Sequence, residues 1–185
     1  MTTCAGILLV GGASRRFGSP KAFAFFEGET LAERSHRILS EVCDRVLAVG
    51  KTGDGLALPF EVYDDGSAVR APIVGVVAGL RLASADACLV LPVDMPWLTA
   101  PFLRELAAAV EGADVAVPPT GPLPGAYRAS VLPVLERRLR EGHLSLRGAL
   151  AELRTRVVDA EPAILRNVNT RADLQGPVRK MNQGA

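Results

Sequence analysis

The sequence has no apolar run that approaches the roughly 18 residues needed to span a membrane. Its first apolar stretch, residues 5–10, is too short for the hydrophobic region of a secretory signal peptide, and no basic segment precedes it. The formal net charge is only +1, so no global field would attract nucleic acid or an anionic membrane. These absences predict a cytoplasmic protein that binds neither nucleic acid nor a membrane, and any cationic site must be local.

Cysteine and histidine are also scarce. The three cysteines, Cys4, Cys43 and Cys88, are odd in number and lack CxxC spacing, which argues against a disulfide framework or a zinc site and favours thiols in a reducing compartment. His36 falls inside an expected helix and His143 in a turn, and neither stands beside Ser, Cys or Asp in a triad-like pattern. We expect both histidines to be structural.

What the sequence does contain is the composition of an ordinary globular protein. Of its 185 residues, 49% are hydrophobic and 22% charged. A single domain of this size buries about 70% of the surface of its unfolded chain. We expect one domain over residues 1–176 and a frayed polar tail over residues 177–185.

Short apolar runs alternate with helical patterns along the first two thirds of the chain. This alternation predicts an α/β fold with three layers, in which helices cover an open, doubly wound, mostly parallel, Rossmann-like sheet. Thr30 and Glu33 form a capping box for the first helix, and the segment 118–127, PPTGPLPGAY, is expected to be a loop. The expected strands are 6–10, 22–26, 45–49, 60–63, 88–93, 114–117 and 157–158, and the expected helices are 31–42, 73–83, 101–110, 131–141, 146–153 and one from Thr170.

The first strand runs directly into a glycine-rich loop, GGASRRFGSPKA, with Arg15, Arg16 and Lys21 close together. In an open α/β sheet, ligands bind outside the carboxyl ends of the strands. Glycines let backbone N–H groups approach phosphate oxygens, and cations neutralise the remaining charge. The loop has neither GxxxxGK[ST] nor GxGxxG, which disfavours a P-loop and a dinucleotide site. A tight turn with solvated cations is the alternative, but a turn needs no three-cation cluster.

Asp94 follows an apolar strand, so its carboxylate is expected at the same edge of the sheet. Because Mg²⁺ needs only one or two carboxylates when substrate phosphates and waters complete its shell, one aspartate can suffice. Alternatively, Asp94 caps a helix or forms a turn before Pro96. The segment 64–66, DDG, is ordinary turn composition, and a functional role there is equally compatible with the residues.

Asn167 and Asn169 stand two residues apart. In an extended segment they would point the same way and form a paired amide hook. The alternative is that they cap the helix expected from Thr170.

The loop sequence matches the signature GGxSxRxGxxK and resembles the sugar-nucleotide-transferase-like nucleotidyltransferases. With YDDGSAVRAPIVGVVAGL, LVLPVDMPWL and NVNTRADL further along, the chain is most similar to the molybdenum cofactor guanylyltransferases, the molybdopterin-guanine dinucleotide biosynthesis protein A family. The resemblance implies a nucleotidyltransferase fold, with residues 1–117 as nucleotide-binding half and 118–176 as acceptor side. It implies transfer of GMP from GTP to the terminal phosphate of molybdopterin, release of pyrophosphate, and Mg²⁺ as cofactor.

The same resemblance implies roles for individual residues. Arg16 and Lys21 would hold the triphosphate, with Lys21 facing the α-phosphorus and Arg15 only assisting. Asp94 would bind Mg²⁺, and Asp65 would contact the nucleotide. Of these residues, Lys21, Arg16 and Asp94 form the expected catalytic set.

Contacts to the base and the acceptor follow in the same way. The residues that would border guanine and its ribose are Leu9, Val10, Gly11 and Gly12. The acceptor would lie near Asn167 and Asn169, although no cation occurs between Val115 and Tyr127 where relatives carry basic residues, which leaves the acceptor's identity open. A molybdoenzyme or a cofactor-delivery protein would then receive the product.

Two alternatives remain. One is a cytidylyltransferase of the same fold that acts on molybdopterin or another phosphorylated acceptor; those relatives usually have Ala-Ala-Gly where this chain has Val10, Gly11 and Gly12. The second glycine leaves space beside a purine, which favours GTP. The other alternative is a non-catalytic nucleotide-binding protein, which would be expected to lose Lys21 or Asp94, and both are present.

Overall fold

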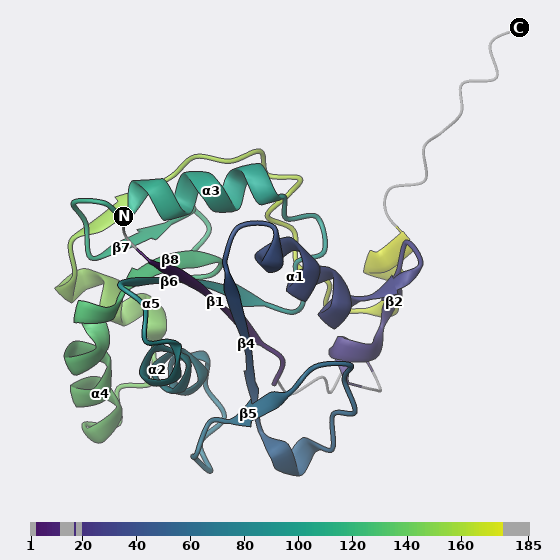
Figure 1. The fold of residues 1–185 in the computed structure, drawn as a ribbon, viewed down its shortest axis with the longest axis horizontal. Coiled ribbons are helices and arrows are strands. Elements are labelled where there is room, and N and C mark those ends of the chain that lie inside the picture. The colour runs from purple at the N-terminus through teal and green to yellow at the C-terminus, as the bar shows by residue number, and fades with distance from the viewer. Residues whose placement is uncertain (1–2, 12–16, 18–19, 176–185) are drawn as a thin grey trace, which may run out of the picture.

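A computed structural model of the chain describes residues 3–11, 17 and 20–175. Its main sheet has seven strands in the order β5-β4-β1-β6-β8-β7-β9, and only β8 runs antiparallel to its neighbours (Figure 1). The predicted α/β fold with a mostly parallel sheet is therefore confirmed. The strands are β1 (Cys4–Leu9), β4 (Arg45–Gly50), β5 (Val62–Asp64), β6 (Ala87–Pro92), β7 (Val115–Val117), β8 (Gly125–Arg128) and β9 (Thr155–Val157).

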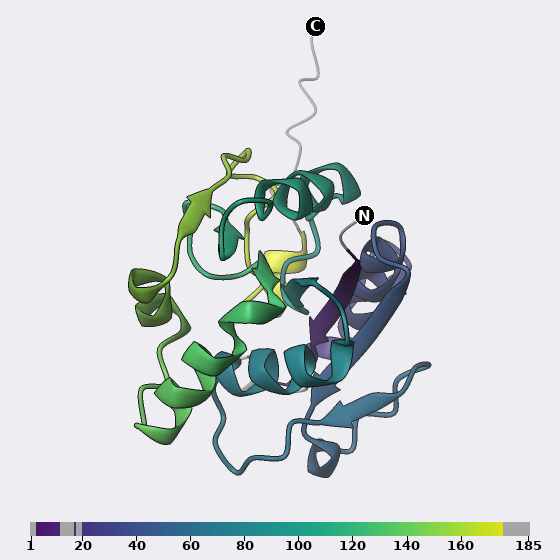
Figure 2. The same ribbon diagram turned by 60° about the vertical axis from the view of Figure 1, so that its left-hand side comes forward.

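Helices cover both faces of the sheet (Figures 1 and 2). Along β1, Leu8 points into the core under α1 (Leu31–Ser40) and α3 (Ala100–Ala109), whereas Ile7 and Leu9 belong to the core on the other face. That second core is closed by α2 (Pro72–Ala83), α4 (Leu132–Arg140) and α5 (Leu146–Ala149). Because both faces are buried, the strand reads as a continuous apolar run rather than an alternating one.

Helix α2 approaches β1 closely because it carries glycine where the two elements meet. A Cβ added at Gly79 would lie 2.6 Å from Ile7 Cγ2, and one at Gly75 would lie 2.8 Å from Leu9 Cδ2. Both distances are well inside van der Waals contact, so any side chain at these positions would push the helix away from the sheet. The close approach brings the first turns of α2 to the carboxyl end of β1.

The start of α1 confirms the predicted capping box. Thr30 Oγ1 accepts a hydrogen bond from the Glu33 backbone N–H at 3.2 Å, and the Glu33 carboxylate accepts one from the Thr30 N–H at 2.9 Å. Before it, β2 (Phe25–Phe26) and β3 (Glu29–Thr30) form a small hairpin. The strand predicted from residue 22 is shorter, because the Phe23 N–H donates to Pro20 O and closes a 3-10 turn over Lys21–Phe23.

The expectation of a loop throughout 118–127 is wrong at its end, because β8 begins at Gly125 and pairs with β6 and β7. Its small residues pack tightly: a Cβ at Gly125 would lie 2.8 Å from Tyr127 Cε2 and 3.1 Å from Val117 Cγ1. Tyr127 is fully buried, and its hydroxyl donates to Pro122 O at 2.5 Å. The strand therefore depends on partners distant in sequence that no local pattern reveals.

The remaining differences concern the lengths and types of elements. Helix α5 has four residues and continues as a 3-10 turn over Leu150–Glu152, and the helix expected from Thr170 is a 3-10 helix over Arg171–Gln175. No helix in the described part of the chain is long and apolar enough to cross a membrane. The tail predicted at 177–185 lies outside the described residues.

Candidate functional site

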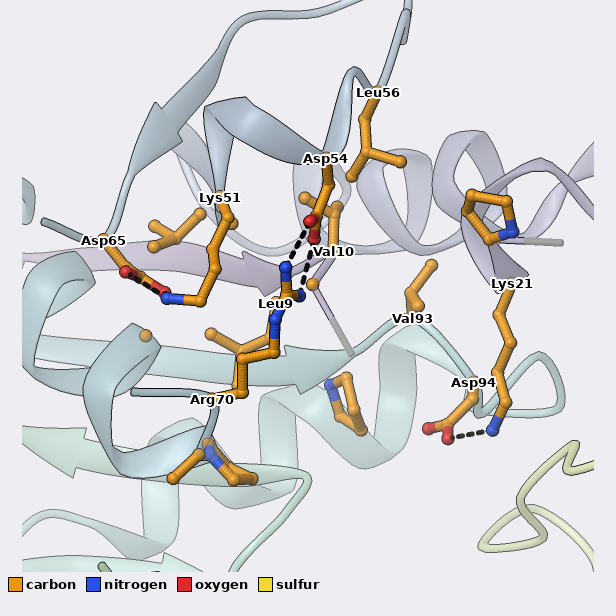
Figure 3. A pocket seen from close by; sticks show the side chains of 18 of the residues that line it. Leu9, Val10, Lys21, Lys51, Asp54, Leu56, Asp65, Arg70, Val93 and Asp94 are labelled. Atoms are coloured by element: carbon orange, nitrogen blue, oxygen red, sulfur yellow. Dashed lines mark hydrogen bonds and ion pairs between the residues drawn. The ribbon is translucent and has the colours of Figure 1, made fainter. Parts of the chain in front are cut away.

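A pocket of about 600 Å³ lies at the carboxyl edge of the sheet, where β1, β4 and β6 end (Figure 3). The chain continues from β1 to β4 on one side and later returns to β6 on the other, so strand order reverses here. Ligands of open α/β sheets bind at such a point. The pocket is lined by Leu9, Val10, Gly11, Pro20, Lys21, Val49, Gly50, Lys51, Asp54, Leu56, Asp65, Arg70, Ala71, Pro72, Gly75, Pro92, Val93, Asp94 and Leu123.

The pocket brings together most of the residues that the sequence predicts for nucleotide binding. They are Leu9, Val10, Gly11, Lys21, Asp65 and Asp94. Gly12, Arg15 and Arg16 lie outside the described residues, so their roles remain predictions.

At one end of the pocket, Lys21 and Asp94 form an ion pair, with Nζ 3.0 Å from Oδ2. Their side chains are 17% and 22% exposed, so the pair is largely shielded but still reachable by a ligand. Asp94 lies in the turn after β6, and its backbone oxygen accepts a hydrogen bond from the Val168 N–H at 2.8 Å. Asp94 therefore occupies a turn and also presents its carboxylate to the pocket, so the two alternatives considered for this residue are compatible.

At the other end, Asp65 pairs with Lys51, which directly follows β4. Lys51 Nζ lies 2.8 and 3.0 Å from the two Asp65 carboxylate oxygens, and it donates to Ser67 O at 2.5 Å. Asp64 has a different role: its carboxylate accepts from the Thr52 hydroxyl and from the backbone N–H groups of Thr52 and Gly66, and these hydrogen bonds lower its pKa to about 2. In the DDG segment, the first aspartate thus forms the turn and the second lines the pocket.

A third ion pair in the pocket joins Asp54 and Arg70 (Figure 3). Lys51, Asp54 and Arg70 are not among the residues predicted from the sequence. For Lys51 a signal was available, because a residue that directly follows a buried parallel strand lies at the ligand-binding edge of the sheet. Asp54 and Arg70 carry no such signal, since each stands in a connecting segment.

The two asparagines expected near the acceptor lie in an irregular segment beside this site. Asn169 Oδ1 accepts a hydrogen bond from Lys21 Nζ at 3.3 Å, whereas Asn167 is exposed, and neither asparagine belongs to the pocket lining. The Asp173 carboxylate accepts from the backbone N–H groups of Asn169 and Thr170, each at 2.8 Å. Asp173 therefore caps this turn, which leaves the Asn169 side chain directed to Lys21.

Neither histidine lines the pocket. The His36 ring stacks on Phe60 with ring centroids 4.3 Å apart, and burial lowers the pKa of His36. His143 is exposed beside Glu141.

Among the described residues, no group of three or more His, Cys, Asp or Glu side chains could hold a metal ion by itself. Asp94 presents a single carboxylate at the pocket. One carboxylate fits Mg²⁺ that is shared with substrate phosphates and waters, and it does not fit a metal held by protein ligands alone.

The profile of the MobA-like NTP transferase domain matches residues 6–157. The chain belongs to this family. It is 30% identical to the molybdenum cofactor guanylyltransferase of Desulfosudis oleivorans, over 95% of this chain and 94% of the relative. It is 32% identical to the probable molybdenum cofactor guanylyltransferase of Bacillus subtilis, over 95% of each chain.

Solved structures of similar proteins agree with the MobA-like assignment. Molybdopterin-guanine dinucleotide biosynthesis protein A from Archaeoglobus fulgidus superposes with a TM-score of 0.78 at 25% identity, covering 92% of this chain and 95% of that one. The 2-C-methyl-D-erythritol 4-phosphate cytidylyltransferase of Thermus thermophilus has a TM-score of 0.71 at 20% identity and shares the fold alone. The MobA-like fold thus extends to enzymes that use another nucleotide.

Proposed function

We propose that this protein is a Mg²⁺-dependent guanylyltransferase that transfers GMP from GTP to the terminal phosphate of molybdopterin. Relatives named molybdenum cofactor guanylyltransferase match it over 95% of its length, which supports this substrate pair. The observation that carries the proposal is the Lys21–Asp94 pair in a pocket at the carboxyl edge of the sheet. In the reaction, an acceptor phosphate oxygen bonds to the α-phosphorus of GTP as the bond to the bridging oxygen breaks, and pyrophosphate leaves.

Each part of the pocket has a role in this proposal. Leu9, Val10 and Gly11 border the base and ribose, and Asp65 contacts the nucleotide. Lys21 Nζ exchanges Asp94 for phosphate oxygens and stabilises the charge that shifts as pyrophosphate departs. Since a phosphate monoester is already an anionic nucleophile, positioning and charge neutralisation are needed more than a general base.

Asp94 is the residue of this chain that would hold Mg²⁺. Bound there, the ion would neutralise phosphate charge. Asp94 is suited to this because its carboxylate is partly exposed and its backbone is fixed by Val168.

The acceptor is assigned to the Lys21 end of the pocket, beside the segment that carries Asn167 and Asn169. The hydrogen bond from Lys21 to Asn169 supports this assignment, because it puts the amide next to the proposed phosphate-binding cation. The finished dinucleotide would pass to a molybdoenzyme or a cofactor-delivery protein.

The test is nucleotide selection followed by turnover. We expect isothermal titration with Mg²⁺ to show GTP binding at least tenfold more tightly than CTP, which corresponds to about 1.4 kcal/mol. With molybdopterin present, GTP should yield pyrophosphate and the guanine dinucleotide, and EDTA should abolish both. Preference for CTP would favour the cytidylyltransferase alternative, and tight GTP binding without pyrophosphate release would favour a non-catalytic nucleotide-binding protein.

A further inference from the structure

The Asp54–Arg70 pair is a two-pronged ion pair within the pocket. Arg70 NH1 donates to Asp54 Oδ2 at 2.9 Å and NH2 donates to Oδ1 at 2.5 Å, so two parallel N–H groups meet the two carboxylate oxygens. In the view of Figure 3 the pair lies between the Lys51–Asp65 and Lys21–Asp94 pairs.

Asp54 is held in place by its backbone, independently of Arg70. It ends a 3-10 turn over Thr52–Asp54, in which its N–H donates to Lys51 O at 2.9 Å. Asp64 fixes the start of this turn by accepting from the Thr52 N–H and hydroxyl at 2.8 and 2.6 Å. The backbone of Asp54 therefore keeps its place if Arg70 leaves, and its carboxylate stays at this side of the pocket.

Two of the pocket carboxylates, Asp65 and Asp54, differ in how readily a ligand could take the place of their partner. Asp65 is held by Lys51, which is itself 14% exposed and also bonded to Ser67 O, and by the Ser67 N–H. Asp54 instead faces Arg70, and the side chains of the two are 23% and 50% exposed. Because an ion pair with an exposed partner contributes little to stability, exchanging Arg70 for a ligand that makes the same two bonds costs little.

Guanine offers those two bonds. Its N1–H and N2–H groups lie side by side on one edge and point the same way, as do the two N–H groups of a guanidinium fork. On the corresponding edges, adenine and cytosine each pair one amino group with a ring-nitrogen acceptor, and uracil has one N–H between two carbonyl groups. Of the four bases, guanine alone matches a carboxylate with two parallel donors.

We propose that Asp54 is the residue that reads guanine, by accepting from N1–H and N2–H, and that Arg70 occupies this position until the nucleotide displaces it. This inference rests on the proposed use of GTP. The Arg70 guanidinium lowers the pKa of Asp54, so the carboxylate is already ionised before the base arrives.

The test compares GTP with ITP, whose base lacks only the N2 amino group. Binding of both nucleotides is measured by isothermal titration for the wild type, Asp54→Asn, Asp54→Ala and Arg70→Ala. Asp114→Asn is the matched control, because Asp114 makes a similar ion pair with Arg154, at 2.8 Å, but precedes β7 at the opposite edge of the sheet. Thermal melting of each variant verifies folding.

We expect the wild type to bind GTP at least tenfold more tightly than ITP. Both Asp54 variants should reduce this ratio to within about twofold, because neither asparagine nor alanine offers two acceptor oxygens to N1–H and N2–H. Arg70→Ala and Asp114→Asn should keep the wild-type ratio. An unchanged ratio in the Asp54 variants, or an equal loss in Arg70→Ala, would overturn the inference. A wild type that does not prefer GTP over CTP would instead contradict the proposed function.

Discussion

Lys21 Nζ lies 3.0 Å from Asp94 Oδ2, although 73 residues separate the two in sequence. The contact follows from the pairing of β1 with β6, in which Leu9 is opposite Pro92 and the Val93 N–H donates to Leu9 O at 3.2 Å. The segments that leave these adjacent strands start side by side, and the 3-10 turn over Lys21–Phe23 returns the lysine to the strand ends.

Replacing Lys21 with alanine should mainly affect the chemical step. In the proposed reaction, its compact charge would stabilise the α-phosphoryl oxygens more in the transition state than in the ground state. We expect kcat to fall by on the order of a hundredfold or more, with a smaller change in GTP affinity. Steady-state kinetics and direct GTP binding measure the two effects, with Arg154→Ala as a surface control. Normal turnover at saturating GTP would remove Lys21 from the reaction.

Arg16→Ala should behave differently from Lys21→Ala, a prediction that rests on the sequence alone. A guanidinium can fork onto phosphate oxygens in the ground state as well as later, so its loss should chiefly raise the KM for GTP. Steady-state kinetics on Arg16→Ala should show a raised KM for GTP with a smaller change in kcat. A loss of kcat without a change in KM would contradict this prediction.

Asp94→Asn keeps the shape of the side chain and removes its charge. Activity should collapse at millimolar Mg²⁺, because the amide is a much weaker ligand for the ion. The folded protein loses one partly exposed ion pair, so the free energy of unfolding should change by roughly 1 kcal/mol or less. A magnesium titration of activity, together with thermal melting of the ligand-free protein, measures both; near-normal turnover would exclude Asp94 as the metal ligand.

Gly79→Ala tests the close approach of α2 to β1. The added methyl group would lie 2.6 to 2.9 Å from three atoms of the buried Ile7 side chain. Overpacking of this kind costs about 1–3 kcal/mol, which exceeds the helix propensity of roughly 1 kcal/mol that alanine gains over glycine. Chemical denaturation should therefore show a less stable protein. Gly53→Ala is the control, since a Cβ there has no atom within 4 Å, and it should be neutral.

The stacked His36 predicts a pH dependence of stability. Burial lowers its pKa below the ordinary value of 6.5, so the unfolded chain binds the proton more readily than the folded one. The stabilising effect of keeping His36 neutral is complete above pH 6.5 and is lost as pH falls through the lower, folded pKa. We expect the stability of the wild type to fall more steeply between pH 7 and 5 than that of His36→Gln. Parallel slopes in denaturation curves would contradict this.

The sequence correctly predicts those parts of the fold that depend on residues close together in the chain. Gly6–Val10 reads as a buried strand from its own residues, and Thr30 with Glu33 specifies the start of α1 within four positions. Strand β8 could not be predicted this way, because Gly125 and Ala126 have low strand propensity and gain their stability from β6 and β7.

The same distinction holds for the candidate site. Lys21 can be identified as a site residue because it belongs to the glycine-rich, cationic loop after the first strand, and Asp94 because it follows another apolar strand. Pairs such as Asp54 with Arg70 join two connecting segments, and only the folded chain shows that they meet. The roles of Gly12 and Arg16 still rest on the sequence.

The position of β8 also affects how the protein can be assembled during synthesis. In the sheet, β8 lies between β6 and β7, but it follows β7 in the chain. Until β8 has been synthesised, the N–H and C=O groups on this edge of β6 have no partner strand. Open edges of this kind pair readily with other chains. A truncated chain that ends near Val117 would contain β1, β4, β5, β6 and β7 but would lack β8. Because it would still present the open edge of β6, we expect it to aggregate. In the folded chain, the antiparallel strand β8 closes this edge of β6.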